Sequence, residues 1–232
     1  LNMTFKLFTS QELAIVCPTK DQPKKVEMLL KSMAKSYIKP AQIIIAYSGQ
    51  NLNHVTKPFK KQLNCICLQC PQSGQVLQRS YAHKHLRPNI RLIIHLDDDI
   101  SLDPNALGQM LDFWNTHDHR EGKPLAGVSF NLTNIPYLRN HWLRKLFFLQ
   151  THPKGYVSIA GYASPYCPAS TTHDTEWLLG GATAWSRDVI DKFKHPIKFP
   201  TRWAVCEDLI YSFPLRKTHK MKVFHEAKAR HN

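Results

Sequence analysis

Four short apolar segments, each stopped by polar or turn-forming residues, constrain the fold of this chain more than any other feature. They lie at residues 12–20, 41–51, 63–71 and 90–99. Each is long enough for a buried strand and far too short to cross a bilayer. Apolar residues at helical spacing follow in three further segments, residues 21–36, 74–86 and 103–117. The resulting order, strand, helix, strand, strand, helix, strand, helix, predicts an α/β sandwich with a mostly parallel sheet.

Two of these predicted helices begin with residues suited to a helix start. Asp21 is the expected N-cap of the first helix, with Pro23 in its first turn, and Asp103 is the expected N-cap of the third, followed by Pro104. After about residue 130 the pattern becomes irregular, although residues 137–149 are expected to be helical. The chain has no internal repeat or clear linker, so we expect a single domain.

Polar segments follow three of the predicted strands at the point where each strand ends. These are CPTKD at residues 17–21, YSGQ at residues 47–50 and the aspartate triplet at residues 97–99. Ligands of open parallel sheets bind at the carboxyl ends of the strands. The three segments are therefore expected to meet at one edge of the sheet.

The aspartate triplet is the first candidate for chemistry. On a continuing strand, Asp97 and Asp99 would leave from the same face and Asp98 from the other. Two carboxylates on one face suit a hard cation such as Mg²⁺ or Mn²⁺. The alternative is a helix cap in a solvated acidic loop, but Asp103 already supplies that cap.

A second acidic pair, Glu207 and Asp208, begins a predicted helix. Carboxylates are favoured at a helix N-terminus by the helix dipole, which is one sufficient explanation of the pair. The other is a general base that removes a proton from a substrate hydroxyl. The sequence pattern leaves both open.

A net charge of +14 indicates an anionic ligand or partner. A phosphate-bearing ligand, a lipid surface and a nucleic acid would each satisfy it, as would plain solvated faces. The segment at residues 138–150 combines basic with bulky apolar residues, which is typical of helices at a membrane surface, with packing on the domain as the alternative. No signal peptide or membrane span is recognised, so a cytoplasmic protein is expected, with peripheral contact at the inner face of a membrane considered.

The six cysteines predict no disulfide or metal framework. Cys65, Cys67 and Cys70 resemble half of a zinc site, but a second cluster at ligand spacing is missing from the sequence. Alternation of Cys65 and Cys67 with apolar residues favours a reduced, buried strand.

Taken in order, these motifs resemble the family-two glycosyltransferases of the GT-A fold. The resemblance rests on seven segments over residues 14–231: AIVCPTKD, IIIAYSGQ, GQVLQRSYA, LDDDISLDP, EWLLGGATAWSRDVI, CEDLIYSF and AKARH. It implies a three-layer α/β/α sandwich with a mixed, mostly parallel central sheet. Residues 1–232 would form one domain, with a donor half over about 1–130 and an acceptor and catalytic-base half over about 131–232.

The resemblance also implies the site. Asp208 would act as the catalytic base with Glu207 in support, and a divalent cation, Mn²⁺ or Mg²⁺, would be held by Asp97, Asp99 and His231. The nucleotide-sugar donor (UDP-, dTDP- or GDP-linked) would contact Pro18, Thr19, Lys20, Asp21, Tyr47, Ser48, Arg79, Asp97, Asp98, Gly180 and Gly181. Trp177 and Trp203 are candidate stacking residues for the acceptor, a glycan or lipid-linked saccharide, with an ordinary place in the core as the alternative.

Three departures from the family pattern refine this expectation. Tyr47 and Ser48 stand where many members have an aspartate that contacts the base, so Tyr47 is a candidate to stack on it. Ser80 stands where an asparagine is usual. The signature of processive synthases after residue 213 is missing from the sequence, which favours transfer of one sugar at a time.

Two rival functions remain at the level of sequence. A metal-dependent nucleotidyltransferase or phosphoryl-transfer enzyme would also use clustered aspartates, although its glycine-rich loop after the first strand is missing from residues 17–25. A non-enzymatic module that binds nucleic acid would explain the positive charge but not the paired acids. We therefore expect no nucleic-acid partner.

Overall fold

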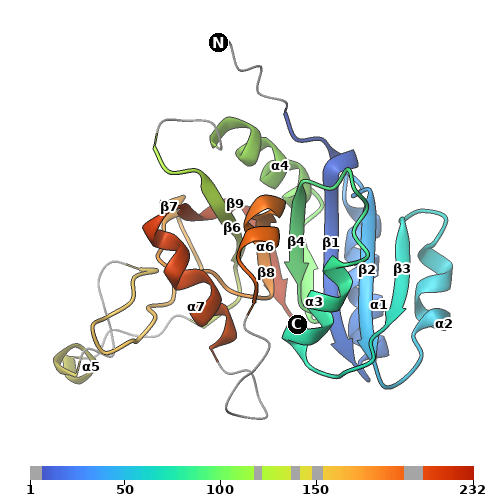
Figure 1. The fold of residues 1–232 in the computed structure, drawn as a ribbon, viewed down its shortest axis with the longest axis horizontal. Helices are drawn as coiled ribbons and strands as arrows, with labels where there is room; N and C mark the ends of the chain where they lie inside the picture. The colour runs from blue at the N-terminus through green and yellow to red at the C-terminus, as the bar shows by residue number, and fades with distance from the viewer. Residues whose placement is uncertain (1–6, 118–121, 137–141, 148–153, 196–205) are drawn as a thin grey trace.

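A mixed sheet of nine strands runs through the molecule in the computed structural model, which describes residues 7–117, 122–136, 142–147, 154–195 and 206–232 (Figure 1). The strands lie in the order β3-β2-β1-β4-β8-β6-β9-β5, and β7 pairs with β9. Their bounds are β1 Leu13–Lys20, β2 Gln42–Ser48, β3 Cys65–Gln69, β4 Leu92–Leu96, β5 Ile100–Leu102, β6 Leu125–Leu132, β7 His173–Asp174, β8 Ala182–Ser186 and β9 Lys220–His231.

Helices and short helical turns connect these strands. The helices are α1 Pro23–Lys35, α2 Asn53–Thr56, α3 Gln75–His83, α4 Ala106–His117, α5 Trp142–Leu146, α6 Arg187–Lys192 and α7 Glu207–Ser212. Three 3₁₀ turns are η1 Ser10–Glu12, η2 Lys57–Phe59 and η3 Phe213–Lys217. The strands and helices predicted in the first half of the chain are thus confirmed, with ends that differ by a few residues.

The first half of the sheet is parallel, and its strand ends coincide as expected. β1 pairs in parallel with both β2 and β4, and β2 pairs in parallel with β3. In this register Lys20 lies opposite Ser48, and Tyr47 lies opposite Gln69. The polar segments that follow β1 and β2 therefore lie side by side at one edge of the sheet.

The second half of the sheet brings the C-terminus back to that same edge. β8 is antiparallel to both β4 and β6, and β6 is parallel to the long strand β9. The far end of β9 pairs antiparallel with β5, so that Ile100 lies opposite His231. Residues more than a hundred positions apart in the sequence, Asp99 and His231, are thereby brought together.

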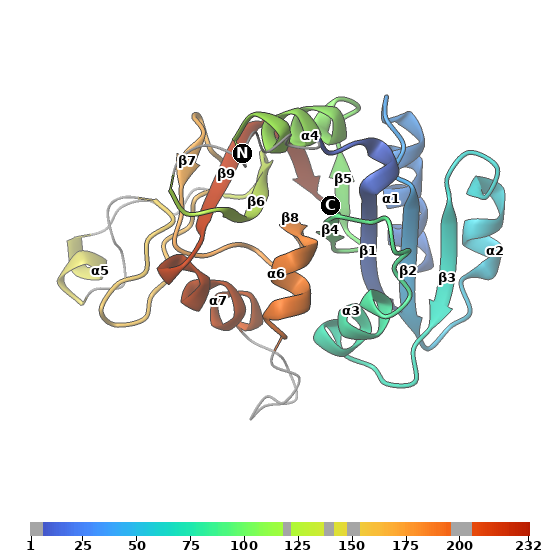
Figure 2. The same ribbon diagram turned by 45° about the horizontal axis from the view of Figure 1, so that its top comes forward.

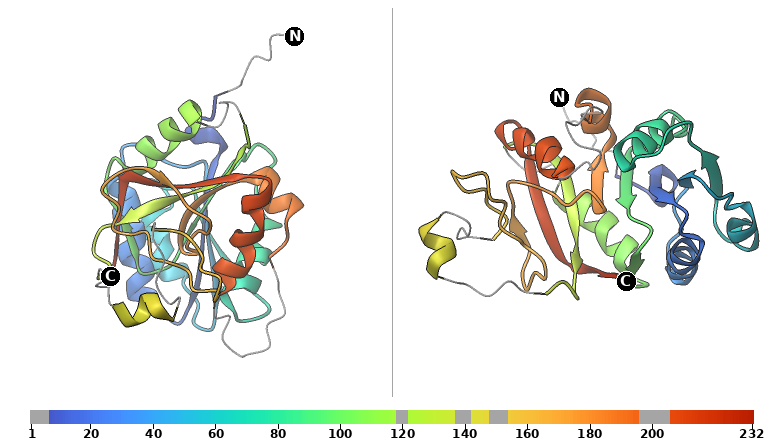
Figure 3. Two further views of the ribbon diagram at one scale, coloured as in Figure 1. Left: turned by 90° about the vertical axis from the view of Figure 1, so that its left-hand side faces the viewer. Right: turned by 90° about the horizontal axis from the view of Figure 1, so that it is seen from below.

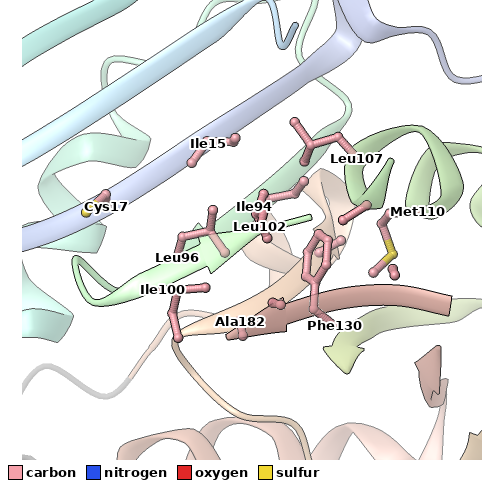
Figure 4. Packing of buried hydrophobic residues seen from close by; sticks show 14 of the residues in the cluster. Ile15, Cys17, Ile94, Leu96, Ile100, Leu102, Leu107, Met110, Phe130 and Ala182 are labelled. Atoms are coloured by element: carbon pink, nitrogen blue, oxygen red, sulfur yellow. The ribbon is translucent and has the colours of Figure 1, made fainter. Parts of the chain in front are cut away.

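Helices cover both faces of the sheet, which confirms the three-layer α/β/α prediction (Figures 1 and 2). Side chains of β1 alternate between the two faces, as strand geometry requires. Ile15 and Cys17 pack in the core that includes buried residues of α1 and α4, whereas Ala14 and Val16 pack in the core that includes residues of α3, α6 and α7. Figure 4 shows the first core between the sheet and α4, where Leu107 and Met110 lie near Ile94, Leu102 and Phe130.

Several local expectations need correction. Asp21 does not cap α1, because Gln22 occupies the cap position and the Asp21 carboxylate accepts a hydrogen bond from the Gln50 amide, 2.7 Å away. Asp103 lies three residues before α4 begins at Ala106, and its carbonyl accepts a hydrogen bond from the Ala106 amide. Of the helix predicted over residues 137–149, α5 covers Trp142–Leu146, and residues 137–141, 148 and 149 lie outside the described residues.

The remaining sequence expectations concern cysteines and the membrane. All six cysteines are free, and Cys65 and Cys67 lie on β3 as predicted. Burial raises the pKa of the Cys65 thiol to about 12, so it stays protonated at neutral pH. Among the described residues, no helix is long and apolar enough to cross a bilayer.

Gly127 tests the packing between β6 and β8. A methyl group at this position would lie 2.7 Å from a Leu178 methyl carbon and 2.8 Å from the Trp185 ring. We expect Gly127→Ala to lower the free energy of unfolding by about 1–3 kcal/mol through overpacking. Gly108→Ala is the matched control, because Gly108 lies in α4 with nothing within 4 Å of the added carbon. That control should stabilise by about 0.5–1 kcal/mol in urea denaturation, and equal effects of the two variants would refute the packing at Gly127.

Candidate active site

The aspartate triplet forms a turn. β4 ends at Leu96, β5 begins at Ile100, and the Ile100 amide donates to the Asp97 carbonyl at 3.1 Å. The expectation of a continuing strand, with Asp97 and Asp99 on one face, is therefore wrong. A turn points the three carboxylates toward different partners, which reduces the repulsion that three adjacent negative charges would otherwise suffer.

Asp97 is joined to the second acidic pair through a buried arginine. Arg79 Nη2 donates to Asp97 Oδ1 at 2.7 Å, and Arg79 Nη1 donates to Glu207 Oε1, also at 2.7 Å. Gln75 at the start of α3 adds a third contact, since its amide donates to Asp97 Oδ1 at 2.6 Å. One guanidinium thus holds the end of β4 and the start of α7 at a fixed separation.

Burial gives this bridge its importance. Arg79 is 1% exposed, so the prediction that it contacts the donor is corrected: its charge faces the buried Glu207 and the partly exposed Asp97. Burial raises the pKa of Glu207, and the adjacent Arg79 charge opposes that rise. A buried charge without a partner is very unfavourable, so the three groups depend on one another.

Asp98 faces β1. Its Oδ2 accepts a hydrogen bond from the Thr19 hydroxyl at 2.5 Å. Partial burial raises the pKa of Asp98, and the Thr19 hydrogen bond opposes the rise. Asp98 thus leaves the turn on the side of Thr19, in the segment predicted to contact the nucleotide, and its own predicted contact with the donor stays a prediction.

Asp99 is the carboxylate best suited to a cation. Its Oδ2 accepts a hydrogen bond from Lys25 Nζ at 3.1 Å, whereas its Oδ1 is buried without a hydrogen-bond partner and lies 3.5 Å from His231 Nε2. The hydrogen bond to Asp99 raises the pKa of Lys25. Within the described ranges no group of three or more His, Cys, Asp and Glu could hold a metal ion. Asp99 and His231 alone offer two ligands, so a cation bound between them would need further ligands from a bound molecule or from water.

The glycine pair before β8 makes room for the acidic groups. A Cβ at Gly180 would lie 2.6 Å from Glu207 Oε1 and 3.0 Å from Arg79 Nη1. A Cβ at Gly181 would overlap the Asp97 carboxylate, and the Gly181 carbonyl accepts the Asp97 amide at 2.9 Å. Glycine is therefore needed at both positions so that the acidic side chains and Arg79 can lie against the backbone, whether or not a sugar also binds there.

Asp208 is more accessible than Glu207. It is the second residue of α7, is half-buried, and uses Oδ1 to accept the Leu209 amide at 2.8 Å. Its Cβ lies 3.4 Å from the position that a Cβ on Gly180 would occupy. Asp208 therefore lies beside the Asp97–Arg79–Glu207 bridge with its carboxylate outside that bridge.

Other predicted residues have different surroundings. Pro18 and Thr19 are buried at the end of β1, and Lys20 and Asp21 after them are exposed. Ser48 is buried, and its hydroxyl has no hydrogen-bond partner. Tyr47 is only 3% exposed and packs in the apolar core, so the prediction that it stacks on a base is corrected.

The two tryptophans predicted to contact the acceptor have different outcomes. Trp177 is buried, packs edge-on against Tyr166 with ring centroids 5.2 Å apart, and donates from its indole to the Ser164 carbonyl. It is a core residue, which corrects its assignment to the acceptor. Trp203 lies outside the described residues.

Sequence reasoning missed three residues that organise the site. Gln78 is buried in α3 and donates from its amide to the carbonyls of Thr19 and Ala46, both at 2.7 Å, which links the ends of β1 and β2. Gln75 and Lys25 contact the aspartates as described above. Their positions at helix starts that follow strand ends were the available signal, but the partners of their side chains depend on the tertiary fold.

A group of histidines behind Glu207 was also missed. His83 and His95 face each other with their Nε2 atoms 2.9 Å apart, and the His195 ring lies 5.8 Å from that of His95. His195 Nδ1 is 4.0 Å from Glu207 Oε2. Burial and the nearby Arg79 charge lower the pKa of His83 to about 4 and that of His195 to about 3. These two rings are therefore neutral at physiological pH, and leave Arg79 as the positive partner of Glu207.

The fold resembles several solved structures, two of the three described below being complexes with nucleotide-sugars. TarS of S. aureus, residues 1–349, matches with a TM-score of 0.63 at 13% identity, over 93% of this chain and 58% of that one. The same TarS fragment in complex with UDP-GlcNAc matches with a TM-score of 0.59 at 12% identity, over 93% and 56%. The mannosyltransferase PcManGT of Pyrobaculum calidifontis, in complex with GDP-Man and Mn²⁺, matches with a TM-score of 0.56 at 11% identity, over 94% and 56%.

These likenesses establish the fold class. The chain spans a little over half the length of the structures it matches. No protein-family model matches the sequence, and no curated protein matches it.

The Arg79 bridge can be tested by its effect on stability. Arg79→Met should lower the free energy of unfolding by about 3–5 kcal/mol, because it leaves Asp97 and Glu207 as uncompensated acids. Urea denaturation measures this change. Lys31→Met is the control, since Lys31 forms an exposed pair with Glu27 and its loss should cost less than about 1 kcal/mol. Similar losses in the two variants would show that the buried bridge is not a major stabilising contact.

Proposed function

We propose that the protein is an inverting glycosyltransferase that moves one sugar from a nucleotide-sugar donor to a hydroxyl group of a glycan or lipid-linked saccharide. The observation that carries this proposal is the grouping of the aspartate turn, the glycine pair and Asp208 around Arg79. The chain that carries this grouping has the same fold class as structures bound to UDP, UDP-GlcNAc and GDP-Man. Residues of both halves of the chain supply it.

Residues at the ends of the parallel strands support the proposed nucleotide site in the donor half of the chain. Thr19 and Asp98 are hydrogen-bonded to each other, and exposed Lys20 and Asp21 follow Thr19 directly. Their position at the carboxyl edge of the sheet supports the proposal that a nucleotide binds there. UDP, dTDP and GDP remain the candidate nucleotides.

A divalent cation is proposed at Asp99 and His231. When bound there, it would neutralise the donor diphosphate and so make the nucleoside diphosphate a better leaving group. Asp99 offers its unpartnered Oδ1 and His231 its Nε2. Asp97 stays a predicted ligand, but its Oδ1 already accepts hydrogen bonds from Arg79 and Gln75. Lys25 balances the charge of Asp99 and is positioned to contact a phosphate of the donor.

Asp208 is proposed as the base that removes the proton of the acceptor hydroxyl. Glu207 is less suited to this step, because it is buried and paired with Arg79. Asp208 keeps an oxygen that is free of the helix hydrogen bond. The deprotonated oxygen would attack the anomeric carbon on the side opposite the diphosphate, form the new glycosidic bond and release the nucleoside diphosphate. The configuration at that carbon is inverted.

Asp99→Ala tests the cation. In a panel of UDP-, dTDP- and GDP-sugars, we expect Mn²⁺ or Mg²⁺ to increase the thermal stabilisation by one donor, and the variant to lose that increase. Asp112→Ala, which removes an exposed carboxylate of α4, should keep it. Unchanged metal-dependent donor binding in Asp99→Ala would refute the cation assignment.

Asp208→Asn tests the base. We expect donor binding to be retained and transfer to fall by about 10²–10⁴-fold, the usual contribution of a general base. Asp188→Asn is a close control, because Asp188 is also the second residue of a six-residue helix, α6. Transfer is measured as nucleoside diphosphate released in the presence of acceptor. Near-normal turnover in Asp208→Asn would exclude Asp208 as the base, and release of pyrophosphate would favour a nucleotidyltransferase.

A further inference from the structure

Helix α5 and the residue after it carry an exposed apolar surface that the site does not use. Trp142, Leu143, Leu146 and Phe147 are 69%, 41%, 61% and 63% exposed. They occupy four of six consecutive positions, and we call them the α5 patch. Large apolar side chains gathered in this way mark an interaction site more often than scattered ones do.

The surrounding sequence is entirely free of acidic residues. From residue 122 to residue 173 there is no Asp or Glu, and five basic residues occur: Lys123, Arg139, Arg144, Lys145 and Lys154. Two of these, Arg144 and Lys145, belong to α5 itself. A suitable partner of the α5 patch therefore combines an apolar region with negative charge.

Helix α5 lies at one outer edge of the molecule. Figures 1 and 2 show it far from the parallel strands, and Figure 3 (right) shows it well apart from the C-terminus. The C-terminal Asn232 amide donates to the Asp99 carbonyl at 2.7 Å. The α5 patch is therefore a surface separate from the one that holds the aspartate turn.

We propose that the α5 patch docks the protein on an anionic membrane surface. Trp and Phe side chains would enter the interface between headgroups and acyl chains, and the basic segment would attract the lipid charge. The proposed function adds a consequence: a membrane-bound enzyme would be held at the surface that carries a lipid-linked acceptor. This consequence rests on the proposed function, whereas the docking itself does not.

A second copy of the chain is a less suitable occupant. Each copy carries a net charge of +14, and the sequence around α5 offers no acidic residue to pair with the basic residues of a second copy. Like charges at short range oppose such association. The patch has four side chains, whereas each partner of a stable protein–protein interface contributes about 20–30 residues.

Vesicle sedimentation tests the proposal. The chain is mixed with vesicles of phosphatidylcholine alone or of phosphatidylcholine with phosphatidylglycerol. We expect binding to the anionic vesicles, weakening as salt is raised. The triple variant Trp142→Ser, Leu146→Ser and Phe147→Ser should bind at least about tenfold more weakly. Tyr37→Ser is the control, since Tyr37 is 78% exposed at the end of α1, and it should bind like the unmodified chain.

Each other outcome would overturn the proposal. These are no binding to anionic vesicles, equal binding to neutral ones, and equal binding by the triple variant. A concentration-dependent dimer in sedimentation velocity that the triple variant abolishes would assign the patch to self-association instead. The triple variant should retain donor-induced thermal stabilisation, so that a failure of docking and a failure of the proposed glycosyl transfer are read from separate measurements.

Discussion

Arg79 lies buried between Asp97 at the end of β4 and Glu207 at the start of α7, and donates a hydrogen bond to each carboxylate. Arg79 and Glu207 are both buried and Asp97 is partly exposed, so loss of Arg79 would leave the buried Glu207 without its positive partner, which is costly. Helix α3, which carries Arg79, is also tied to the ends of β1 and β2 by Gln78. The relative placement of these five elements therefore depends on two buried side chains of α3.

This arrangement separates the roles of neighbouring acids. Glu207 is engaged by Arg79, which leaves the adjacent Asp208 outside the bridge and half-buried. In the aspartate turn, Asp97 is paired with Arg79, Asp98 with Thr19, and Asp99 with Lys25. Each carboxylate has a different compensating group, which is how a strongly basic chain holds so many acids at one edge. Only Asp99 keeps a buried oxygen without a hydrogen-bond partner among these three residues.

The two halves of the chain contribute in different ways. The parallel strands align polar ends at one edge through register alone, whereas the antiparallel return through β8 and the long strand β9 delivers the glycine pair and His231. Helix α5 lies apart from this apparatus (Figure 2). Its exposed apolar side chains have no part in the core, which is consistent with a contact outside the chain.

The sequence determined the α/β order and the strand ends. Buried strands require short apolar runs, and helices that pack on a sheet require apolar residues at helical spacing, so both patterns can be read directly. The sequence also singled out the acids, the glycine pair and Arg79 as a family-like set. It could not determine that the triplet turns, that Arg79 and Tyr47 are buried, or that Trp177 packs in the core. Nor could it find Lys25, Gln75, Gln78 and the histidines, because a side chain's partner is set by distances between elements far apart in the chain. Those distances are set only when the chain has folded and α3 has packed on the sheet with Arg79 buried. Burial then decides which charged groups are paired inside the protein and which remain available for chemistry.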